Sequence, residues 1–391
     1  MFQFDECVLD PQRVELRRDG AIVHLEKQVF DVLVYLVEHR ERVVSKHELL
    51  DAVWGNRFVG DSAVTSRLKA ARRAVGDDGR RQARIATIRG VGYRFVSNVR
   101  ETDTPASDGH KRQQIHYCKA PRGVQIAYAT SGSGPPLVKA ANWLTHLDLE
   151  WESPIWAHWI DPLSSQHQLV RYDQRGCGLS DWEVVDFSLD AWVEDLEVVV
   201  EAAGVDRFPL LGISQGGAVA VAYAVRHPER VSRLALVGAY SRGRLSRSVT
   251  ADQREEAELD MAVGRVAWRR EDASYRRVFA TQFLPDADRE TWDAFTSLRL
   301  ASTSTENAMR FMDTFAHIDI VDRAKLVQAP TLILHSRNDR RVPASQARQL
   351  ATLIPHSQLQ LLNSGNHIQT ATEPAWPTLQ KSIAHFLSQD Q

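Results

Sequence analysis

One pentapeptide constrains the fold of this 391-residue chain more than any other stretch. Residues 212–216 read Gly-Ile-Ser-Gln-Gly; an apolar run begins at residue 208, and an alanine-rich helical stretch follows up to residue 227. A serine on a sharp strand-to-helix turn exposes its hydroxyl over the end of a sheet, and flanking glycines let the backbone pass close by. The pattern predicts that Ser214 is a nucleophile on such a turn.

Length and charge distribution indicate more than one domain. A chain of this length predicts two or three domains, and its formal net charge of −2 points to no partner. The charge is uneven, because residues 57–98 contain ten Lys and Arg against three Asp, an excess of seven positive charges. Such a basic stripe is typical of a phosphate-binding face.

Composition argues against several classes of protein. The three cysteines, Cys7, Cys118 and Cys177, are too far apart for a disulfide framework or a zinc site. The N-terminus lacks the basic start and apolar core of a signal peptide, and no apolar run approaches the roughly 20 residues that span a membrane. We expect a cytoplasmic protein with reduced thiols, no metal, no cofactor and no membrane contact.

The pattern of elements divides the chain in two. Residues 100–109 are polar and predict a linker, which we place at 99–114 between a domain at 1–98 and a domain at 115–391. In the second domain, short apolar strands alternate with helical segments, which predicts a mostly parallel sheet with helices on both faces. Only helical, charge-rich sequence occupies 241–322, which predicts a helical cap.

A helical segment at 62–75 is the candidate DNA-binding element of the first domain. Val64, Leu68, Ala71 and Val75 form one apolar stripe, and small hydroxyl and basic residues lie on other faces. Small residues let a helix enter the major groove, and arginine pairs with guanine through two hydrogen bonds. A solvated helix face is the alternative for a charge run alone.

The hairpin predicted at 85–96 favours DNA binding. The sequence Ile-Ala-Thr-Ile-Arg-Gly-Val-Gly-Tyr-Arg-Phe at 85–95 closely resembles the wing of the α+β winged-helix domain of OmpR/PhoB-type response regulators. Residues 43–45 and 49–55 share the resemblance, which covers about 1–98. It implies that double-stranded DNA is bound, usually at tandem half-sites by a homodimer. The contacts it implies are Ser62, Thr65, Ser66, Arg67, Lys69 and Arg73 on the helix, and Thr87 and Arg89 in the wing.

In response regulators a phosphate-accepting receiver domain precedes the winged helix, whereas this sequence starts at the winged helix. We therefore expect the controlling signal to come from the domain behind the linker.

The second domain supplies partners for Ser214. A serine nucleophile needs a base, and the base needs a group that fixes its tautomer. In α/β-hydrolases these residues follow in the order serine, acid, histidine. Asp339 comes just after an apolar strand at 331–335, and His367 just after one at 358–362. His335, His356 and Asp322 are less well placed competitors.

The oxyanion hole requires two backbone amides aimed at the developing charge. Gln215 supplies one and Trp143, after the strand at 137–141, the other. Members of this fold usually carry His-Gly before the second donor, whereas this chain has Ala141 and Asn142. The loop must therefore hold a different shape.

Residues 172–181 look like a loop of hydrolases of the proline-iminopeptidase and esterase groups, and 143–151 is similar to hydrolase-like proteins fused to DNA-binding or cyclase domains. The resemblance covers about 115–387 and implies an α/β-hydrolase fold. A serine nucleophile implies cleavage of an ester, thioester, lactone or amide through an acyl-enzyme. Cap aromatics predict an apolar ligand pocket or simply cap packing: Trp268, Tyr275, Phe279, Phe283, Trp292, Phe311 and Phe315.

The sequence is compatible with three functions. The first is a one-component transcriptional regulator whose hydrolase-like domain binds, and in one version cleaves, a small acyl, ester or lactone effector. The second is a serine hydrolase with an accessory DNA-binding domain. The third is a hydrolase shell that only dimerises or binds a partner, against which the complete triad weighs.

Overall fold

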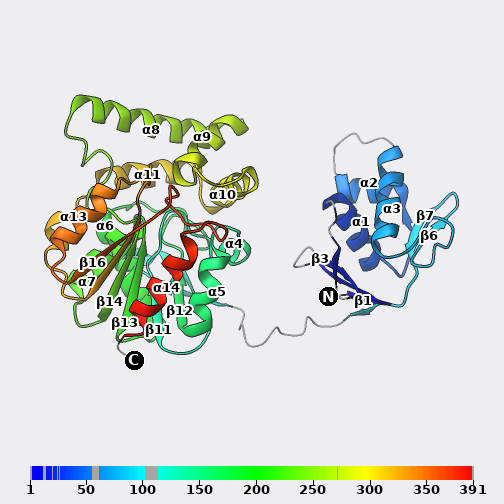
Figure 1. The fold of residues 1–391 in the computed structure, drawn as a ribbon, viewed down its shortest axis with the longest axis horizontal. Coiled ribbons are helices and arrows are strands. Elements are labelled where there is room, and N and C mark those ends of the chain that lie inside the picture. The colour runs from blue at the N-terminus through cyan, green and yellow to red at the C-terminus, as the bar shows by residue number, and fades with distance from the viewer. Residues whose placement is uncertain are drawn as a thin grey trace. The chain divides into compact units, whose positions relative to one another are not determined.

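Separate hydrophobic cores divide the chain into two units, Met1–Gly109 and His110–Gln391. The computed structural model describes residues 2–11, 15–19, 21–23, 25, 27–54, 61–101, 113–270 and 272–389 (Figure 1). Most of the predicted linker, residues 102–112, lies outside the described residues.

The first unit starts with a five-stranded antiparallel sheet, in the order β4-β3-β2-β1-β8. Its strands are β1 (Phe2–Phe4), β2 (Cys7–Asp10), β3 (Glu15–Arg18), β4 (Ala21–Val23) and β8 (Arg100–Glu101). Because β8 pairs with β1, this sheet extends past residue 98.

Three helices and a small second sheet complete the first unit. The helices are α1 (Lys27–Glu38), α2 (Lys46–Trp54) and α3 (Asp61–Ala74), and the sheet has the order β5-β7-β6, with β5 (Val44–Ser45), β6 (Ile85–Ile88) and β7 (Gly92–Phe95). Val64, Leu68 and Ala71 are buried, so α3 packs through the predicted apolar stripe. Other faces of α3 carry exposed side chains.

The second unit is built on an eight-stranded sheet, in the order β16-β15-β14-β13-β11-β12-β10-β9. Its strands are β9 (Gln114–Lys119), β10 (Gln125–Ser131), β11 (Pro136–Lys139), β12 (Gln168–Tyr172), β13 (Phe208–Ile213), β14 (Val231–Val237), β15 (Thr331–Ser336) and β16 (Ser357–Leu362). The strand β10 pairs antiparallel with β9 and with β12, and all other neighbouring strands pair in parallel. This confirms the predicted mostly parallel sheet.

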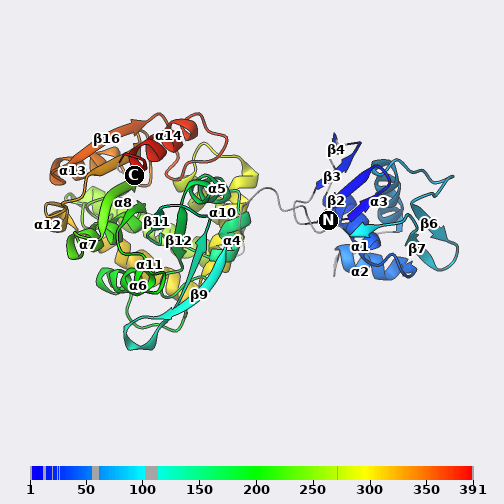
Figure 2. The ribbon, with the colours of Figure 1, turned by 90° about the horizontal axis from the view of Figure 1, so that it is seen from below.

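Helices cover both faces of this sheet because the apolar side chains of the strands alternate between them (Figures 1 and 2). Leu210 packs in one core cluster with α6 (Leu189–Ala202), α7 (Gly216–Arg226) and α13 (Ala344–Leu353). Its neighbour Leu211 packs in the other, with α5 (Ala157–Gln166) and α14 (Trp376–Leu387). Shorter elements are η1 (Pro121–Gly123), α4 (Leu147–Glu152) and α12 (Val321–Ala324).

Four helices between β14 and α12 form the cap: α8 (Ala251–Arg269), α9 (Ala273–Phe283), α10 (Arg289–Ser302) and α11 (Thr305–His317). Each begins after an N-cap residue whose side chain accepts a backbone hydrogen bond, namely Thr250, Asp272, Asp288 and Ser304. Such caps satisfy amides that have no partner within the helix. Figure 1 shows α8 and α9 as the outermost layer of the second unit.

Candidate active site and nucleic-acid interface

Ser214 lies on the turn between β13 and α7, as the pentapeptide predicted. Its φ of 52° is in the left-handed region, which is strained for a residue with a side chain. The turn is tight: a Cβ on Gly212 would lie 2.7 Å from the Cα of Gly217, and one on Gly216 would lie 2.7 Å from the carbonyl oxygen of Ala141. Glycine is therefore required on both sides of the serine.

His367 lies between Ser214 and Asp339. Its Nε2 atom is 2.8 Å from the Ser214 Oγ, and its Nδ1 atom is 2.6 Å from the Asp339 Oδ2. A carboxylate only accepts hydrogen bonds, so Nδ1 carries the proton and Nε2 is left to accept from the serine hydroxyl. The structure thus brings together the three residues that were predicted from chain order.

Asp339 is buried and held by its own loop. Its Oδ1 accepts hydrogen bonds from the amides of Arg341 (2.8 Å) and Val342 (2.9 Å), which leaves Oδ2 for His367. Burial acts to raise the pKa of Asp339, but the charge and hydrogen bond of His367 outweigh it and the pKa is lowered. Its other neighbour, His335, lies 3.6 Å away and donates from Nε2 to the Val342 carbonyl oxygen.

The cap holds the loop that carries His367. The His367 amide donates to the carbonyl oxygen of Phe283 at 2.7 Å. The Gly365 amide donates to the Asp286 Oδ2 at 3.1 Å, and the Asp286 amide donates to the Asn366 Oδ1 at 3.0 Å. Three hydrogen bonds therefore join this loop to the end of α9 and the segment after it.

The loop after β11 lies against the serine turn, through the contact of Ala141 with Gly216. Lys139 is buried, and its Nζ donates to the Asn142 Oδ1 at 2.5 Å. This bond holds Asn142, the residue that departs from the usual His-Gly pattern. Within the described chain, neither the Gln215 nor the Trp143 amide donates a hydrogen bond.

Aromatic side chains of the cap surround Trp143. Its ring centroid lies 5.8–6.2 Å from those of Trp268, Phe279, Phe283 and Phe315. Phe283 also packs against the His367 ring at 5.9 Å. The buried Trp143 Nε1 has no described acceptor, so this apolar enclosure contains one unused donor.

Other cap aromatics pack elsewhere. Phe311 stacks on Trp192 of α6, the Trp292 indole donates to the Leu284 carbonyl oxygen, and Tyr275 is exposed. These three aromatics therefore serve cap packing or face solvent, whereas those around Trp143 lie next to the candidate active site.

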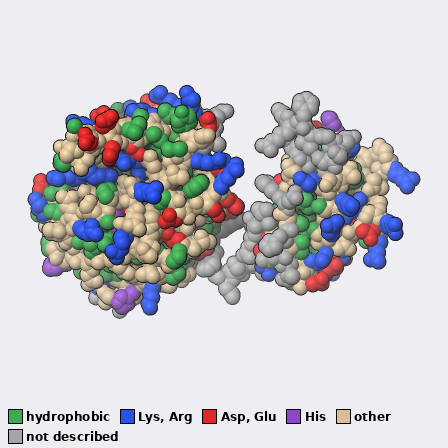
Figure 3. All heavy atoms as spheres, turned by 45° about the horizontal axis from the view of Figure 1, so that its top comes forward, with side chains coloured by type: hydrophobic (Ala, Val, Ile, Leu, Met, Phe, Trp, Pro, Cys, Tyr) green, Lys and Arg blue, Asp and Glu red, His purple; other side chains and the backbone are tan. Residues whose placement is uncertain are grey.

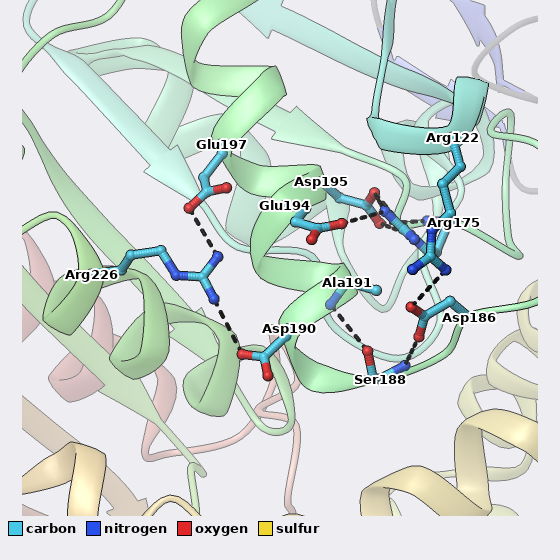
Figure 4. Close-up of polar contacts among 10 residues, drawn as sticks. All are labelled: Arg122, Arg175, Asp186, Ser188, Asp190, Ala191, Glu194, Asp195, Glu197 and Arg226. Carbon is cyan, nitrogen blue, oxygen red and sulfur yellow. Dashed lines mark hydrogen bonds and ion pairs between the residues drawn. The ribbon is translucent and has the colours of Figure 1, made fainter.

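A buried ion pair fixes the loop at residues 173–181. Arg175 donates to Asp195 of α6 at 2.7 Å through Nη2 and at 3.0 Å through Nε (Figure 4). Figure 4 also shows Arg122 paired with Asp186, and Arg226 joining two acids of α6. In the same loop Cys177 is fully buried, and burial raises its thiol pKa well above the usual range. Its position agrees with a small residue packed in a tight turn rather than an oxidant sensor.

In the first unit, the predicted DNA contacts lie on α3 and on the hairpin β6–β7. Thr65, Ser66, Lys69 and Arg73 of α3 are exposed, as is Arg89 at the hairpin turn. Spacings of three and four residues place the α3 side chains on one side of the helix. The side chain of Ser62 lies outside the described residues.

Two predicted contacts also have partners within the unit. Arg67 is half-buried, and its Nε donates to the Gln28 Oε1 of α1 at 3.2 Å. The Thr87 hydroxyl accepts a hydrogen bond of 2.7 Å from Arg72, which also bonds the Ile85 carbonyl oxygen. These bonds join the hairpin to α3 and the helix to α1.

The α/β hydrolase fold family model matches residues 146–374, more than half of the chain. The chain belongs to this family. A second model, the transcriptional regulatory protein C-terminal domain, matches residues 20–95. The α/β-hydrolase domain thus follows an α+β domain of the OmpR/PhoB type, and both resemblances are confirmed. The regulatory domain implies DNA binding.

Relatives of the α/β-hydrolase domain are named as hydrolases. A pyrrolizixenacetamide deacetylase from Xenorhabdus hominickii is 28% identical over 64% of this chain and 91% of its own length. A putative carbamate hydrolase, RutD, from Klebsiella pneumoniae is 31% identical over 54% of this chain and 78% of its own length. An esterase from Exiguobacterium antarcticum has the same fold, with a TM-score of 0.58 and 19% identity over 70% of this chain and 99% of its own.

The sequence did not indicate the structural roles of two residues, one in each unit. Lys139 is signalled only by its charge at the end of an otherwise apolar strand, and Arg72 is one basic residue among ten. Their partners, Asn142 and Thr87, become apparent only in the folded chain.

No helix in the described part of the chain is long and apolar enough to cross a membrane.

Proposed function

We propose that this chain is a DNA-binding transcriptional regulator whose α/β-hydrolase domain binds and cleaves a small acyl, ester or lactone effector and thereby controls DNA binding. One observation carries the proposal: His367 contacts both Ser214 and Asp339 in a chain that also contains a transcriptional regulatory domain. We place this regulator in the cytoplasm and expect a homodimer on tandem half-sites.

The chemistry follows from the direction of the hydrogen bonds. His367 takes the hydroxyl proton of Ser214 at Nε2 while Oγ attacks the acyl carbon, and Asp339 stabilises the resulting imidazolium. The amides of Gln215 and Trp143 donate to the oxyanion. His367 then passes the proton to the leaving alcohol or amine, and water, activated by the same ring, releases the acid from Ser214. Hydrolysis needs no cofactor in this scheme.

The aromatic surroundings of Trp143 favour a ligand with an apolar part. Rings of Trp268, Phe279 and Phe315 surround Trp143, and its unpartnered indole N–H offers one hydrogen bond to an acceptor. Relatives named as a deacetylase and as carbamate hydrolases favour a substrate with an acyl-type carbonyl group. Ligand pockets of this kind combine apolar walls with a few polar groups.

Labelling of the full chain with a fluorophosphonate, and hydrolysis of p-nitrophenyl butyrate, test the chemistry. We expect both in the wild type and neither in Ser214→Ala. If the wild type is not labelled, Ser214 is not an activated nucleophile and the hydrolytic part of the proposal is lost.

DNA recognition is tested separately, by selecting bound sequences from a random duplex library and measuring mobility shifts. The regulatory part predicts that selected duplexes bind and that an acyl-compound panel changes their affinity. If the Ser214→Ala protein loses the response, acylation is the signal; if it retains the response, occupancy is the signal.

A serine hydrolase with an accessory DNA-binding domain is the second candidate, and the assembled triad favours it. In that case esters are hydrolysed, DNA is bound, and no compound in the panel changes DNA affinity. That result would overturn the regulatory part alone.

A further inference from the structure

Three arginine side chains meet where the cap joins the body of the α/β-hydrolase domain. Arg244 and Arg247 belong to the segment between β14 and α8, and Arg341 follows β15, two residues after Asp339. All three line a cavity of about 40 Å³, together with Tyr240, Phe315 and Val342 among others. Since one ordered water needs roughly 10–15 Å³ by this measure, the cavity has room for a small polar group.

A second, larger cavity adjoins the first. It has a volume of about 300 Å³, and Arg244 and Arg247 line both cavities. Glu256 and Gln253 of α8 and Arg340 also line the larger one. Two guanidinium groups thus separate a small inner cavity from a larger polar one. Figure 3 shows a band of Lys and Arg side chains on the visible face of this domain.

Positive charge is in excess around the inner cavity. Among the described residues, Asp260 is the one carboxylate that forms ion pairs with these arginines, and it pairs with both Arg244 and Arg341. The negative charge of Glu256 acts to raise the pKa of Arg244, and that of Asp339 acts to raise the pKa of Arg247, but the net pKa of both arginines is lowered by burial. Arg247 donates only to carbonyl oxygens, those of Arg242 (3.3 Å) and Arg341 (3.2 Å), and no described carboxylate forms an ion pair with it. Burial, followed by the charge of Arg244, lowers the pKa of Arg247 to about 10, so it is still cationic at neutral pH.

Guanidinium groups that cluster in half-buried positions and share a single ion-paired carboxylate are destabilised by desolvation and mutual repulsion. An anionic oxygen group relieves both effects, and the planar fork of arginine suits carboxylate and phosphate oxygens.

The inner cavity adjoins the residues of the candidate active site. Val342 lines it and donates its amide to Asp339. Phe315 lines it and packs against Trp143 at 6.2 Å. Val342 and Phe315 therefore each connect the arginine cluster to a residue of the candidate active site.

We propose that the acyl ligand of this domain carries an anionic oxygen group, a carboxylate or a phosphate, which binds to Arg244, Arg247 and Arg341 at the junction of cap and body. This inference rests on the proposed function for the position of the acyl group, but the anion site itself stands on the arginine geometry. The resulting substrate class is half-esters, amides or lactones of dicarboxylic acids, or phosphorylated acyl compounds.

Binding is tested without turnover in full-length Ser214→Ala protein, through the thermal midpoint of the α/β-hydrolase domain. Glutarate and inorganic phosphate are the probes, and glutaramide and sodium chloride at equal ionic strength are the controls. We expect one or both anions to raise the midpoint by several degrees at millimolar concentration, more than either control. The stronger probe identifies the carboxylate or the phosphate as the ligand's anionic group.

Arg247→Gln, made in the same background, should lose the shift, while Arg289→Gln, an exposed cap arginine, should keep it. Arg244→Gln serves as a second variant in case Arg247→Gln does not fold. A shift that chloride reproduces, or that both cavity variants retain, overturns the anion site while leaving hydrolysis by Ser214 untouched.

Turnover gives an independent measure in the protein with Ser214 intact. The ratio of kcat/KM for mono-p-nitrophenyl glutarate to that for p-nitrophenyl valerate should fall at least tenfold in Arg247→Gln and stay constant in Arg289→Gln. An unchanged ratio in Arg247→Gln overturns the specificity proposal. If the wild type hydrolyses neither ester but still binds the anion, the proposed hydrolysis fails and the anion site stands.

Discussion

The two candidate sites of this chain are built in opposite ways. In the α/β-hydrolase domain, His367 and Asp339 are buried and hydrogen-bonded, so the geometry is fixed before a ligand arrives. On α3, the side chains of Lys69 and Arg73 are exposed, and only their backbone is fixed by the packing of the helix. Chemistry at a few atoms needs preorganised groups, whereas recognition of a long polyanion draws on many weak contacts. A single substitution should therefore abolish one activity and only weaken the other.

Ser214→Ala should have the largest effect, and it tests whether the buried site can be inactivated by one substitution. We expect hydrolysis of p-nitrophenyl butyrate to fall by roughly 10⁴-fold or more, because the attacking oxygen is removed from a fixed constellation. DNA affinity without effector should not change. Substantial residual hydrolysis would show that the buried site is not the catalytic one.

Arg73→Ala measures the exposed site. We expect a loss of DNA affinity of roughly 10- to 100-fold, about 1–3 kcal/mol, and a shallower salt dependence in mobility-shift titrations. Ester hydrolysis should be unchanged. Arg17→Ala, on β3, is the matched control, and an equal effect of the two substitutions would argue against α3 as the recognition helix.

Asp77→Asn alters a fixed group in the same unit as the exposed site, where Asp77 binds the segment that leads into the hairpin β6–β7. Its carboxylate accepts the amides of Asp78, Ala83, Arg84 and Ile85 at 2.8–3.0 Å. An asparagine retains one acceptor oxygen, so we expect a loss of about 1–2 kcal/mol in stability, measured as faster hydrogen exchange across the hairpin β6–β7.

Asp78→Asn is the control for this substitution, since its two amide bonds use one oxygen. Burial acts to raise the pKa of Asp77, but the four amides lower it overall. The stability that this group contributes is therefore present above the unfolded pKa and is lost as pH falls through the lower folded pKa. Equal acid sensitivity of wild type and Asp77→Asn would contradict this.

The smallest expected effect concerns Asp173 in the α/β-hydrolase domain. Burial raises its pKa to about 7, above the unfolded value, so the folded state holds the proton more tightly. The domain should therefore lose about 1 kcal/mol of stability between pH 6 and pH 7 as this proton is released. Asp173→Asn should flatten that slope in urea titrations at the two pH values. An unaltered slope would show that another group titrates.

Sequence patterns predicted what depends on chain order and periodicity. Ser214, Asp339 and His367 each follow a strand whose apolar run was visible, and parallel strands end at one edge of a sheet. The α3 stripe was visible for the same reason, because a helix with one buried face repeats every three or four residues. The strand β9 was missed, since most of its side chains are exposed and give no apolar run.

What could not be predicted depends on pairs that are distant in sequence. Nothing near Arg72 shows that it holds Thr87, and nothing near Phe283 shows that its carbonyl oxygen binds the His367 amide. The excess of basic residues at 57–98 indicated a phosphate-binding face, but it did not show which of these residues are paired within the unit. Arg84, one of the ten, is paired with Asp5 and Glu6 and so is neutralised within the unit.

The hydrogen bonds between the cap and the histidine loop couple the position of the cap to the position of the base, His367. If α9 moves away from the body, either the bonds from His367 and Gly365 break or the loop is pulled with it. If the bonds hold, His367 is drawn away from Ser214 and Asp339; if they break, the histidine loop loses the contacts that fix it from the side of the cap. The cap thus contributes to the alignment of the catalytic base, although it carries none of the three triad residues.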